Sequence, residues 1–283
     1  METREFGWTG VDVAVIGQGT WMIEGAPADE HRAVEALRAG IGLGLTHIDT
    51  AEMYGSGRAE ELVASAIAGR RDEVFLASKV LPQNASYEGT LAACDRSLRR
   101  LGTSQLDLYM LHWPGRHPTR QTMRALEKLA DDGLTRFIGV SNFDVSELQE
   151  AEAALRNHRL SCNQVLYHLG ERGIERRLIP YCASRGIPVV AYSPFGHRDF
   201  PDPGSRSGKV LAEIAARYYR TPRQVALRFL TRDPSVFTIP KASVMEHVKE
   251  NVGGAGWELA PDDIAAIDRA FPAPTRDVPL AML

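Results

Sequence analysis

The strongest constraint on the fold of this chain is a series of eight short apolar runs that recur along almost its whole length. They are Val11–Gly19, Thr46–Asp49, Val74–Lys79, Leu106–His112, Arg136–Asn142, Asn163–Tyr167, Pro188–Ser193 and Val236–Lys241. The runs are continuous rather than alternating, which is typical of strands covered on both faces. Most of them are separated by about 30 residues, the length of one strand–helix unit. The pattern therefore predicts a parallel sheet with intervening helices.

Amphipathic helical patterns fill the intervals, with charged residues opposite the apolar side of each helix. The last interval is longer, and it contains a loop rich in Gly, Pro and Arg (Phe195–Ser207) and an extra helix (Lys209–Tyr219). A second extra helix, capped by Asp262, is expected to end near Phe271.

The beginning of the chain, Phe6–Val15, indicates a β-hairpin with Thr9 and Gly10 at its turn, placed to plug the bottom of a barrel. We therefore predict a single domain of residues 1–283, a (β/α)₈ TIM barrel with an N-terminal β-hairpin and two extra helices. A doubly wound dinucleotide-binding sheet is the rival fold. It is disfavoured because Gly17-Gln18-Gly19 lacks the third glycine of the G-x-G-x-x-G fingerprint.

Composition restricts the partners and the compartment. The net charge of −3 argues against a nucleic-acid partner or a polybasic membrane surface. The N-terminus has no apolar signal-peptide region, and no run is long enough to span a membrane. The three cysteines, Cys94, Cys162 and Cys182, lie in apolar stretches without a C-x-x-C motif, which predicts buried thiols and a cytoplasmic protein.

Polar side chains collect where the apolar runs end. They are Asp49, Lys79, His112, Ser141, Asn142, Gln164, Tyr192, Ser193 and Lys241, with Tyr54 on the loop after the second run. Because the active site of a TIM barrel lies at the carboxyl ends of its strands, these residues predict a catalytic site there.

The motifs around these residues resemble those of the aldo-keto reductases. They are DTAEMYG (Asp49–Gly55), SK (Ser78-Lys79), LDLYMLHWP (Leu106–Pro114), GVSNF (Gly139–Phe143), NQV (Asn163–Val165), AYSPFG (Ala191–Gly196), IPKAS (Ile239–Ser243) and EN (Glu250-Asn251). Within that family the sequence is most similar to bacterial methylglyoxal and broad aldehyde reductases. The resemblance implies a carbonyl reductase that acts on small aldehydes and ketones, and a monomer.

By this resemblance, Asp49, Tyr54, Lys79 and His112 form the catalytic tetrad. Reduction of a carbonyl group by hydride needs a proton donor as negative charge develops on the oxygen. Tyr54 would be that acid, and the ammonium of Lys79 is expected to lower its pKa. Asp49 would supply the counter-ion of Lys79, and His112 would orient the substrate carbonyl.

The resemblance also implies NADPH as the cofactor. Ser141, Asn142 and Gln164 match residues that bind the nicotinamide carboxamide, and Tyr192 matches the aromatic residue that stacks on the ring. A loop over the pyrophosphate begins with Ser193, Pro194, Phe195 and Gly196. On the adenosine side lie Lys241, Ser243, His247 and Asn251. Many members of the family have an arginine where this chain has His247, and a serine where it has Ala242, which leaves the use of NADH open.

For the substrate pocket we expect Trp21, Met53, Trp113 and Phe143, and the short tail after Phe271 predicts an open pocket. Two other functions remain as alternatives. One is a cofactor-binding, redox-sensing regulatory subunit on the same fold, which an intact tetrad does not exclude. The other is a metal-dependent barrel hydrolase, for which the strand ends offer few ligands beyond His112 and Asp49. Otherwise no metal is expected.

Overall fold

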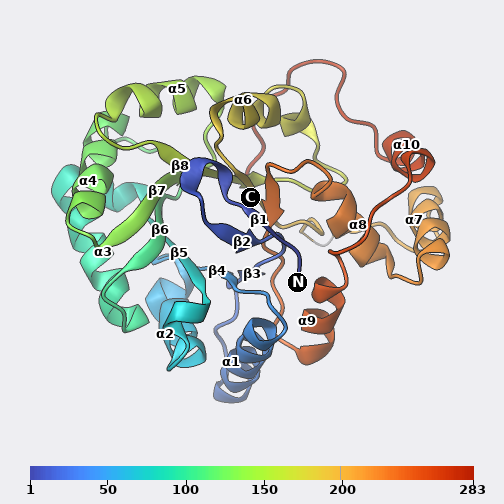
Figure 1. Ribbon diagram of the computed structural model, residues 1–283, viewed down its shortest axis with the longest axis horizontal. Helices are drawn as coiled ribbons and strands as arrows, with labels where there is room; N and C mark the ends of the chain where they lie inside the picture. Colours follow the sequence, from blue (N-terminus) through green and yellow to red (C-terminus); the bar gives the residue numbers. More distant parts are fainter. Residues whose placement is uncertain (198) are drawn as a thin grey trace.

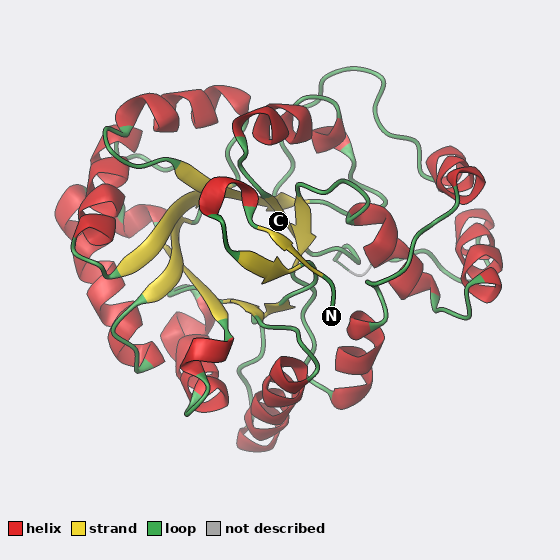
Figure 2. Cartoon of the chain, viewed as in Figure 1, coloured by secondary structure: helices red, strands yellow, loops and turns green. Residues whose placement is uncertain are grey.

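A sheet of eight parallel strands lies at the centre of the computed structural model, which describes residues 1–197 and 199–283 (Figures 1 and 2). The strands follow one another in chain order as β3 (Gln18–Gly19), β4 (His47–Asp49), β5 (Phe75–Val80), β6 (Leu106–Leu111), β7 (Thr135–Ser141), β8 (Leu160–Leu166), β9 (Val189–Tyr192) and β10 (Val236–Thr238). Gly17 N donates to Thr238 O at 2.7 Å, and Thr238 N donates to Val15 O at 2.9 Å. These bonds join the first strand to the last and close the predicted barrel.

Eight helices follow the barrel strands, as the alternating pattern predicts. They are α1 (Pro27–Gly42), α2 (Arg58–Ile67), α3 (Tyr87–Leu101), α4 (Thr119–Asp131), α5 (Val145–Ala154), α6 (Leu178–Arg185), α8 (Pro222–Leu230) and α9 (Met245–Val252). Short 3₁₀ turns occur at η1 (Gly7–Thr9), η2 (Tyr54–Gly57), η3 (Arg71–Glu73), η4 (Pro82–Asn84) and η5 (Gly173–Glu175).

The two extra helices are α7 (Arg206–Arg217) and α10 (Pro261–Ala270), which lie side by side at the right of Figure 1. Their presence confirms the prediction, but the expected cap of α10 is wrong. Ala260 is the N-cap and Pro261 the first helical residue, so Asp262 lies within the first turn. Proline is favoured at that position because its fixed φ suits a helix start.

An N-terminal hairpin is present, as predicted, with the antiparallel strands β1 (Thr3–Glu5) and β2 (Asp12–Ala14). Its first strand precedes the predicted range Phe6–Val15, and η1 lies between the two strands. The apolar run from Val11 to Gly19 is therefore divided between hairpin and barrel. The buried ring of Phe6 lies 5.1 Å from the ring of Phe75 and 5.0 Å from that of Phe237, both inside the barrel. The hairpin thus plugs the bottom of the barrel and leaves the opposite end for a site.

The three cysteines lie in the interior of the protein. Cys94, Cys162 and Cys182 are free and buried, as predicted. Among the described residues, no helix combines the length and the apolar character needed to cross a bilayer.

His47 is a buried titratable group on the barrel's inner wall. Its ring lies 6.1 Å from Phe6 and 5.5 Å from Phe75, and neither ring nitrogen has a partner among the described residues. Burial lowers its pKa from 6.5 to about 4, although Asp49 and Asp107 oppose this shift. In that interval the unfolded chain binds a proton here and the folded chain does not, so the free energy of unfolding falls as the pH falls.

Between about pH 6.5 and pH 4, His47 is expected to lower the free energy of unfolding of the parent protein by roughly 3 kcal/mol. We expect this part of the fall to be absent in His47→Leu. Urea unfolding at a series of pH values would measure this difference. Equal pH slopes for the variant and the parent protein would show that His47 is not the source.

Candidate active site

The four residues predicted to be catalytic lie together at the carboxyl ends of adjoining strands. Asp49 ends β4, Lys79 lies near the end of β5, His112 directly follows β6, and Tyr54 begins η2 after β4. All four side chains are buried, with exposed fractions of 1% for Asp49, 0% for Lys79, 7% for His112 and 9% for Tyr54. Their interactions are therefore only weakly screened by water.

The ammonium group of Lys79 has three hydrogen-bond acceptors, one for each of its protons. Its Nζ lies 2.5 Å from Asp49 Oδ1, 2.9 Å from Thr50 O and 3.3 Å from the Tyr54 hydroxyl oxygen. Because Lys79 donates to the tyrosine oxygen, the phenolic proton is left for another acceptor. The group that receives it must come from the pocket.

The second carboxylate oxygen of Asp49 is also bound. Gln164 Nε2, from β8, donates to Asp49 Oδ2 at 2.7 Å. Both oxygens of this buried carboxylate therefore have hydrogen-bond donors, which offset the free-energy cost of burying its charge. Sequence reasoning placed Gln164 at the cofactor but did not find its contact with Asp49, because the two residues are 115 positions apart.

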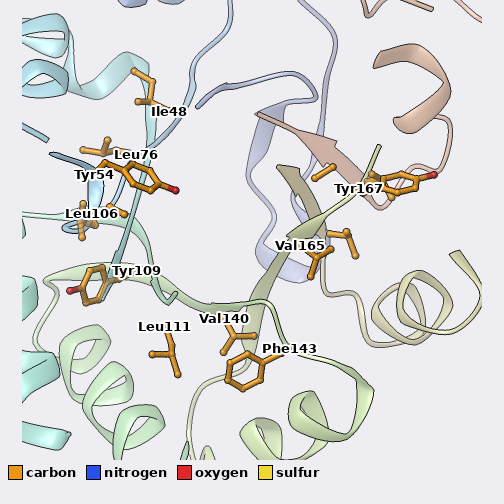
Figure 3. Packing of buried hydrophobic residues seen from close by; sticks show 14 of the residues in the cluster. Ile48, Tyr54, Leu76, Leu106, Tyr109, Leu111, Val140, Phe143, Val165 and Tyr167 are labelled. Carbon is orange, nitrogen blue, oxygen red and sulfur yellow. The ribbon is translucent and has the colours of Figure 1, made fainter. Parts of the chain in front are cut away.

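The turn that presents Tyr54 is unusual in its backbone. Gly55, Ser56 and Gly57 all have positive φ, at 54°, 53° and 95°. For Ser56 this conformation is strained. In Figure 3 the ring of Tyr54 lies beside Leu76 and its hydroxyl points away from that leucine. The turn thus anchors the ring in the core and directs the polar end toward the site.

A buried ion pair supports this turn from below. Glu60, with 0% exposure, accepts hydrogen bonds from Ser78 Oγ and Arg100 Nε, both at 2.6 Å. The guanidinium of Arg100 lies so close beneath Gly57 that a Cβ there would be 2.5 Å from Nε. These residues were missed at the sequence level. The sequence feature that could have indicated a supported turn here is the glycine-rich segment Gly55-Ser56-Gly57, immediately after Tyr54.

Burial has the largest effect on the pKa of the Tyr54 phenol. It raises the pKa of Tyr54, and Asp49 adds to this, while Lys79 lowers the pKa without cancelling the increase. Lys79 therefore lowers the pKa of Tyr54 as expected, but its contribution is smaller than the opposing effects of burial and Asp49. Burial would lower the pKa of Lys79, but Asp49 and Tyr54 outweigh it and the pKa is raised. At neutral pH the site holds a protonated phenol beside an ammonium ion.

His112 is a neutral imidazole across the whole physiological range. Burial, with a contribution from the charge of Lys79, lowers its pKa to about 2. Its ring lies 5.6 Å from the Tyr54 ring in an edge-on arrangement. A neutral imidazole can donate one hydrogen bond, which suits the predicted role of orienting a carbonyl oxygen.

A second polar network borders the same pocket. Asn142, at a φ of 60°, donates through Nδ2 to His112 O at 3.0 Å and to Ser141 Oγ at 3.1 Å. Its Oδ1 accepts from the Tyr192 hydroxyl at 2.9 Å. This network fixes the aromatic ring of Tyr192 relative to the strand that carries Ser141. It connects residues predicted for the cofactor with the backbone of a predicted catalytic residue.

These groups surround a pocket of about 130 Å³. The predicted residues that line it are Asp49, Tyr54, His112, Ser141, Asn142, Gln164, Tyr192, Ser193, Lys241, Trp21, Met53 and Trp113. Lys79 does not line the pocket but contacts Tyr54, which does. The prediction for Phe143 is wrong: this residue follows the end of β7 at Ser141, is only 1% exposed and packs in the hydrophobic core.

The remaining residues predicted for the cofactor lie beyond the pocket, around β10 and α9. Lys241 Nζ donates to Ser243 Oγ at 3.2 Å. Asn251 is buried within α9, and His247 is exposed on its first turn. Phe195 packs against a buried cluster that includes Ala242 and Val248. Pro194 and Gly196 flank Phe195 in the loop after β9 and do not line the pocket.

The C-terminal tail reaches the pocket, contrary to the expectation of an open site. Leu283 lines the pocket, and its N–H lies 3.4 Å from the Tyr192 hydroxyl. Asp277 anchors the tail through Arg176 Nε at 2.6 Å and Arg177 Nη1 at 3.1 Å. These ion pairs join distant parts of the chain, a feature that tail length alone does not reveal.

A closed (β/α)₈ barrel with a phenol, an ammonium, a carboxylate and an imidazole around one pocket at its strand ends has the groups that an enzyme needs for acid–base chemistry. The chain belongs to the Aldo/keto reductase family, whose sequence pattern matches residues 15–271. It is therefore an oxidoreductase, as the resemblance predicted.

Individual relatives support this assignment over nearly the whole chain. The methylglyoxal reductase YeaE of Escherichia coli is 43% identical over 273 residues, covering 96% of each protein. The glyoxal reductase of Bacillus subtilis is 37% identical, covering 92% of this chain and 89% of that protein. A crystal structure of an aldo-keto reductase from Klebsiella pneumoniae in complex with NADPH has a TM-score of 0.93 at 42% identity, covering 100% of this chain and 99% of the other.

Proposed function

We propose that this enzyme reduces small aldehydes and α-dicarbonyl compounds such as methylglyoxal to alcohols, with NADPH as hydride donor and Tyr54 as proton donor. The observation that carries the proposal is the contact between Lys79 Nζ and the Tyr54 oxygen, which leaves the phenolic proton available to the pocket. The activities of the related methylglyoxal and glyoxal reductases support the choice of substrate.

The residues present fit NADPH. Ser141, Asn142 and Gln164 offer hydroxyl and amide groups beside the ring of Tyr192 in the pocket. At the other end, α9 has no side-chain cap, so its first N–H groups can receive a phosphate next to Lys241. The related Klebsiella structure that contains NADPH agrees with this fit.

When bound, NADPH supplies the hydride that the carbonyl carbon receives. Tyr54 transfers its phenolic proton to the carbonyl oxygen, so that one hydride and one proton convert the carbonyl group to an alcohol. Lys79 stabilises the resulting phenolate because its ammonium already contacts that oxygen. Asp49 keeps Lys79 in position, and His112 holds the substrate oxygen near the phenol.

The test is the loss of NADPH absorbance in the presence of purified protein and methylglyoxal, repeated with NADH. We expect turnover with NADPH and slower turnover with NADH. Tight NADPH binding without turnover of any aldehyde would contradict the proposal and favour the regulatory subunit. The expectations of a monomer, a cytoplasmic location and no nucleic-acid or membrane partner stay predictions.

The tail contact gives a further prediction. We expect Leu283→Ala to increase kcat/KM for bulky aldehydes by a few-fold, about the effect of changing one apolar contact in a partly open pocket. Methylglyoxal is too small to need the added space, so its kcat/KM should change by less than about twofold. Steady-state kinetics with the two aldehydes measure the difference.

Met282→Ala is the matched control, because Met282 is 54% exposed and does not line the pocket. Identical kinetics for the Met282 and Leu283 variants would show that the last residue does not limit the substrate.

A further inference from the structure

On the side of the site predicted to bind the adenosine, this chain has His247 where many family members have an arginine. Lys241, which follows β10, is then the basic residue on this side. Among the described residues, its ammonium contacts only the Ser243 hydroxyl. We propose that Arg223 supplies the missing guanidinium and binds the 2′-phosphate of NADPH. This inference rests on the proposed function and concerns the choice between NADPH and NADH.

Hydrogen bonds place the first turn of α8, which carries Arg223, against α9. Thr221 Oγ1 donates to Glu250 Oε1 at 2.7 Å, and Gln224 Nε2 donates to Glu250 O at 2.9 Å. Glu250 lies three residues after His247, so the two share one side of α9. Arg223 stands between Thr221 and Gln224 in the chain, so its backbone lies beside the part of α9 that carries Glu250.

Two aromatic rings hold the Arg223 guanidinium. Its Cζ lies 4.7 Å from the Phe195 ring centroid and 4.9 Å from that of Phe200. Phe195 in turn packs against a buried cluster that includes Ala242 and Val248, the direct neighbours of Lys241 and His247 in the chain. The guanidinium thus lies against the loop after β9, and Phe195 of that loop packs beside the residues predicted to surround the adenosine phosphate.

The charge of Arg223 is available for a ligand. Arg223 is exposed, and no ion pair or hydrogen bond joins it to another described residue. Stacking on a ring uses the face of a guanidinium and leaves the N–H groups at its edge free. Glu250, the neighbouring carboxylate, is bound by the Thr221 hydroxyl. A planar group with paired N–H donors suits a phosphate.

The 2′-phosphate is the distinctive group of NADPH, so the experiment isolates it. Calorimetric titration would compare adenosine 2′,5′-bisphosphate with adenosine 5′-monophosphate, which lacks that phosphate. We expect Arg223→Ala to weaken binding of the bisphosphate by about tenfold or more, the effect of losing a charge-assisted hydrogen bond. Affinity for the monophosphate should stay within about twofold, and Arg223→Lys should give an intermediate loss because a lysine keeps only the charge.

Arg220→Ala is the matched control. Arg220 precedes the same helix, but its guanidinium lies 5.8 Å from the Trp257 ring instead. It removes the same charge from the surface and should leave both affinities unchanged. The full cofactors provide a second comparison, in which Arg223→Ala should reduce the preference for NADP⁺ over NAD⁺.

Two results would overturn the inference while leaving the proposed function intact. Equal weakening of both nucleotides would mean that Arg223 contacts the adenosine instead, and unchanged affinities would mean that it only packs. If the unaltered protein binds neither NADP⁺ nor NAD⁺, both the inference and the proposed function fail.

Discussion

Replacement of Tyr54 by phenylalanine is expected to lower kcat for methylglyoxal reduction by about 10²- to 10⁴-fold, the usual contribution of a positioned general acid. The phenyl ring keeps the packing of Tyr54 in the hydrophobic core. The substitution removes only the hydroxyl, which accepts from Lys79 Nζ at 3.3 Å and is the proposed proton donor. NADPH affinity, measured by fluorescence titration, should change little.

Tyr181→Phe is the control for this substitution. It removes one phenolic hydroxyl from the outer helix α6, where the group donates to Glu152 at 2.5 Å. That variant should keep its activity. Turnover in the Tyr54→Phe protein comparable with the parent would exclude Tyr54 as the proton donor.

Replacement of Lys79 by methionine is expected to reduce the free energy of unfolding by about 3–5 kcal/mol, because it leaves the buried carboxylate of Asp49 without its cation. Lys79 is fully buried and Asp49 is 1% exposed, so water cannot compensate. Gln164 would remain as a donor to Asp49 Oδ2, but an amide does not neutralise the charge. Urea unfolding measures the loss.

The double variant Asp49→Asn with Lys79→Met separates stability from catalysis. It removes both charges, so most of the lost stability should return. Activity should not return, since no ammonium remains beside Tyr54. If the double variant is as unstable as the single one, the buried charge of Asp49 is not the cause of the destabilisation.

The barrel could be predicted from the sequence because its strands are short, apolar throughout and evenly spaced. That pattern follows from burial on both faces, which is a local requirement. The division of Val11–Gly19 between β2 and β3 could not be predicted in the same way, because both strands need apolar residues. Pairing with Thr3–Glu5 and with β10 decides where the run is broken.

The candidate site was predictable in its members but not in its electrostatics. The motifs around Asp49, Tyr54, Lys79 and His112 identified the four residues and their order. The acidity of Tyr54 depends on how completely the folded barrel excludes water, and this raises its pKa despite the adjacent ammonium. The contact of Leu283 with the pocket likewise depends on Asp277 and its arginine partners, far apart in the sequence.

The bonds that join Val15 and Gly17 to Thr238 impose an order on assembly during translation. The first barrel strand is made well before its partner on one side, because β4 to β9 lie between the two in the chain. Until then β3 has an unpaired edge, and the inner face of the hairpin lacks Phe237. Unpaired edges favour association between chains. Synthesis of β10 therefore removes an edge that favours association between nascent chains.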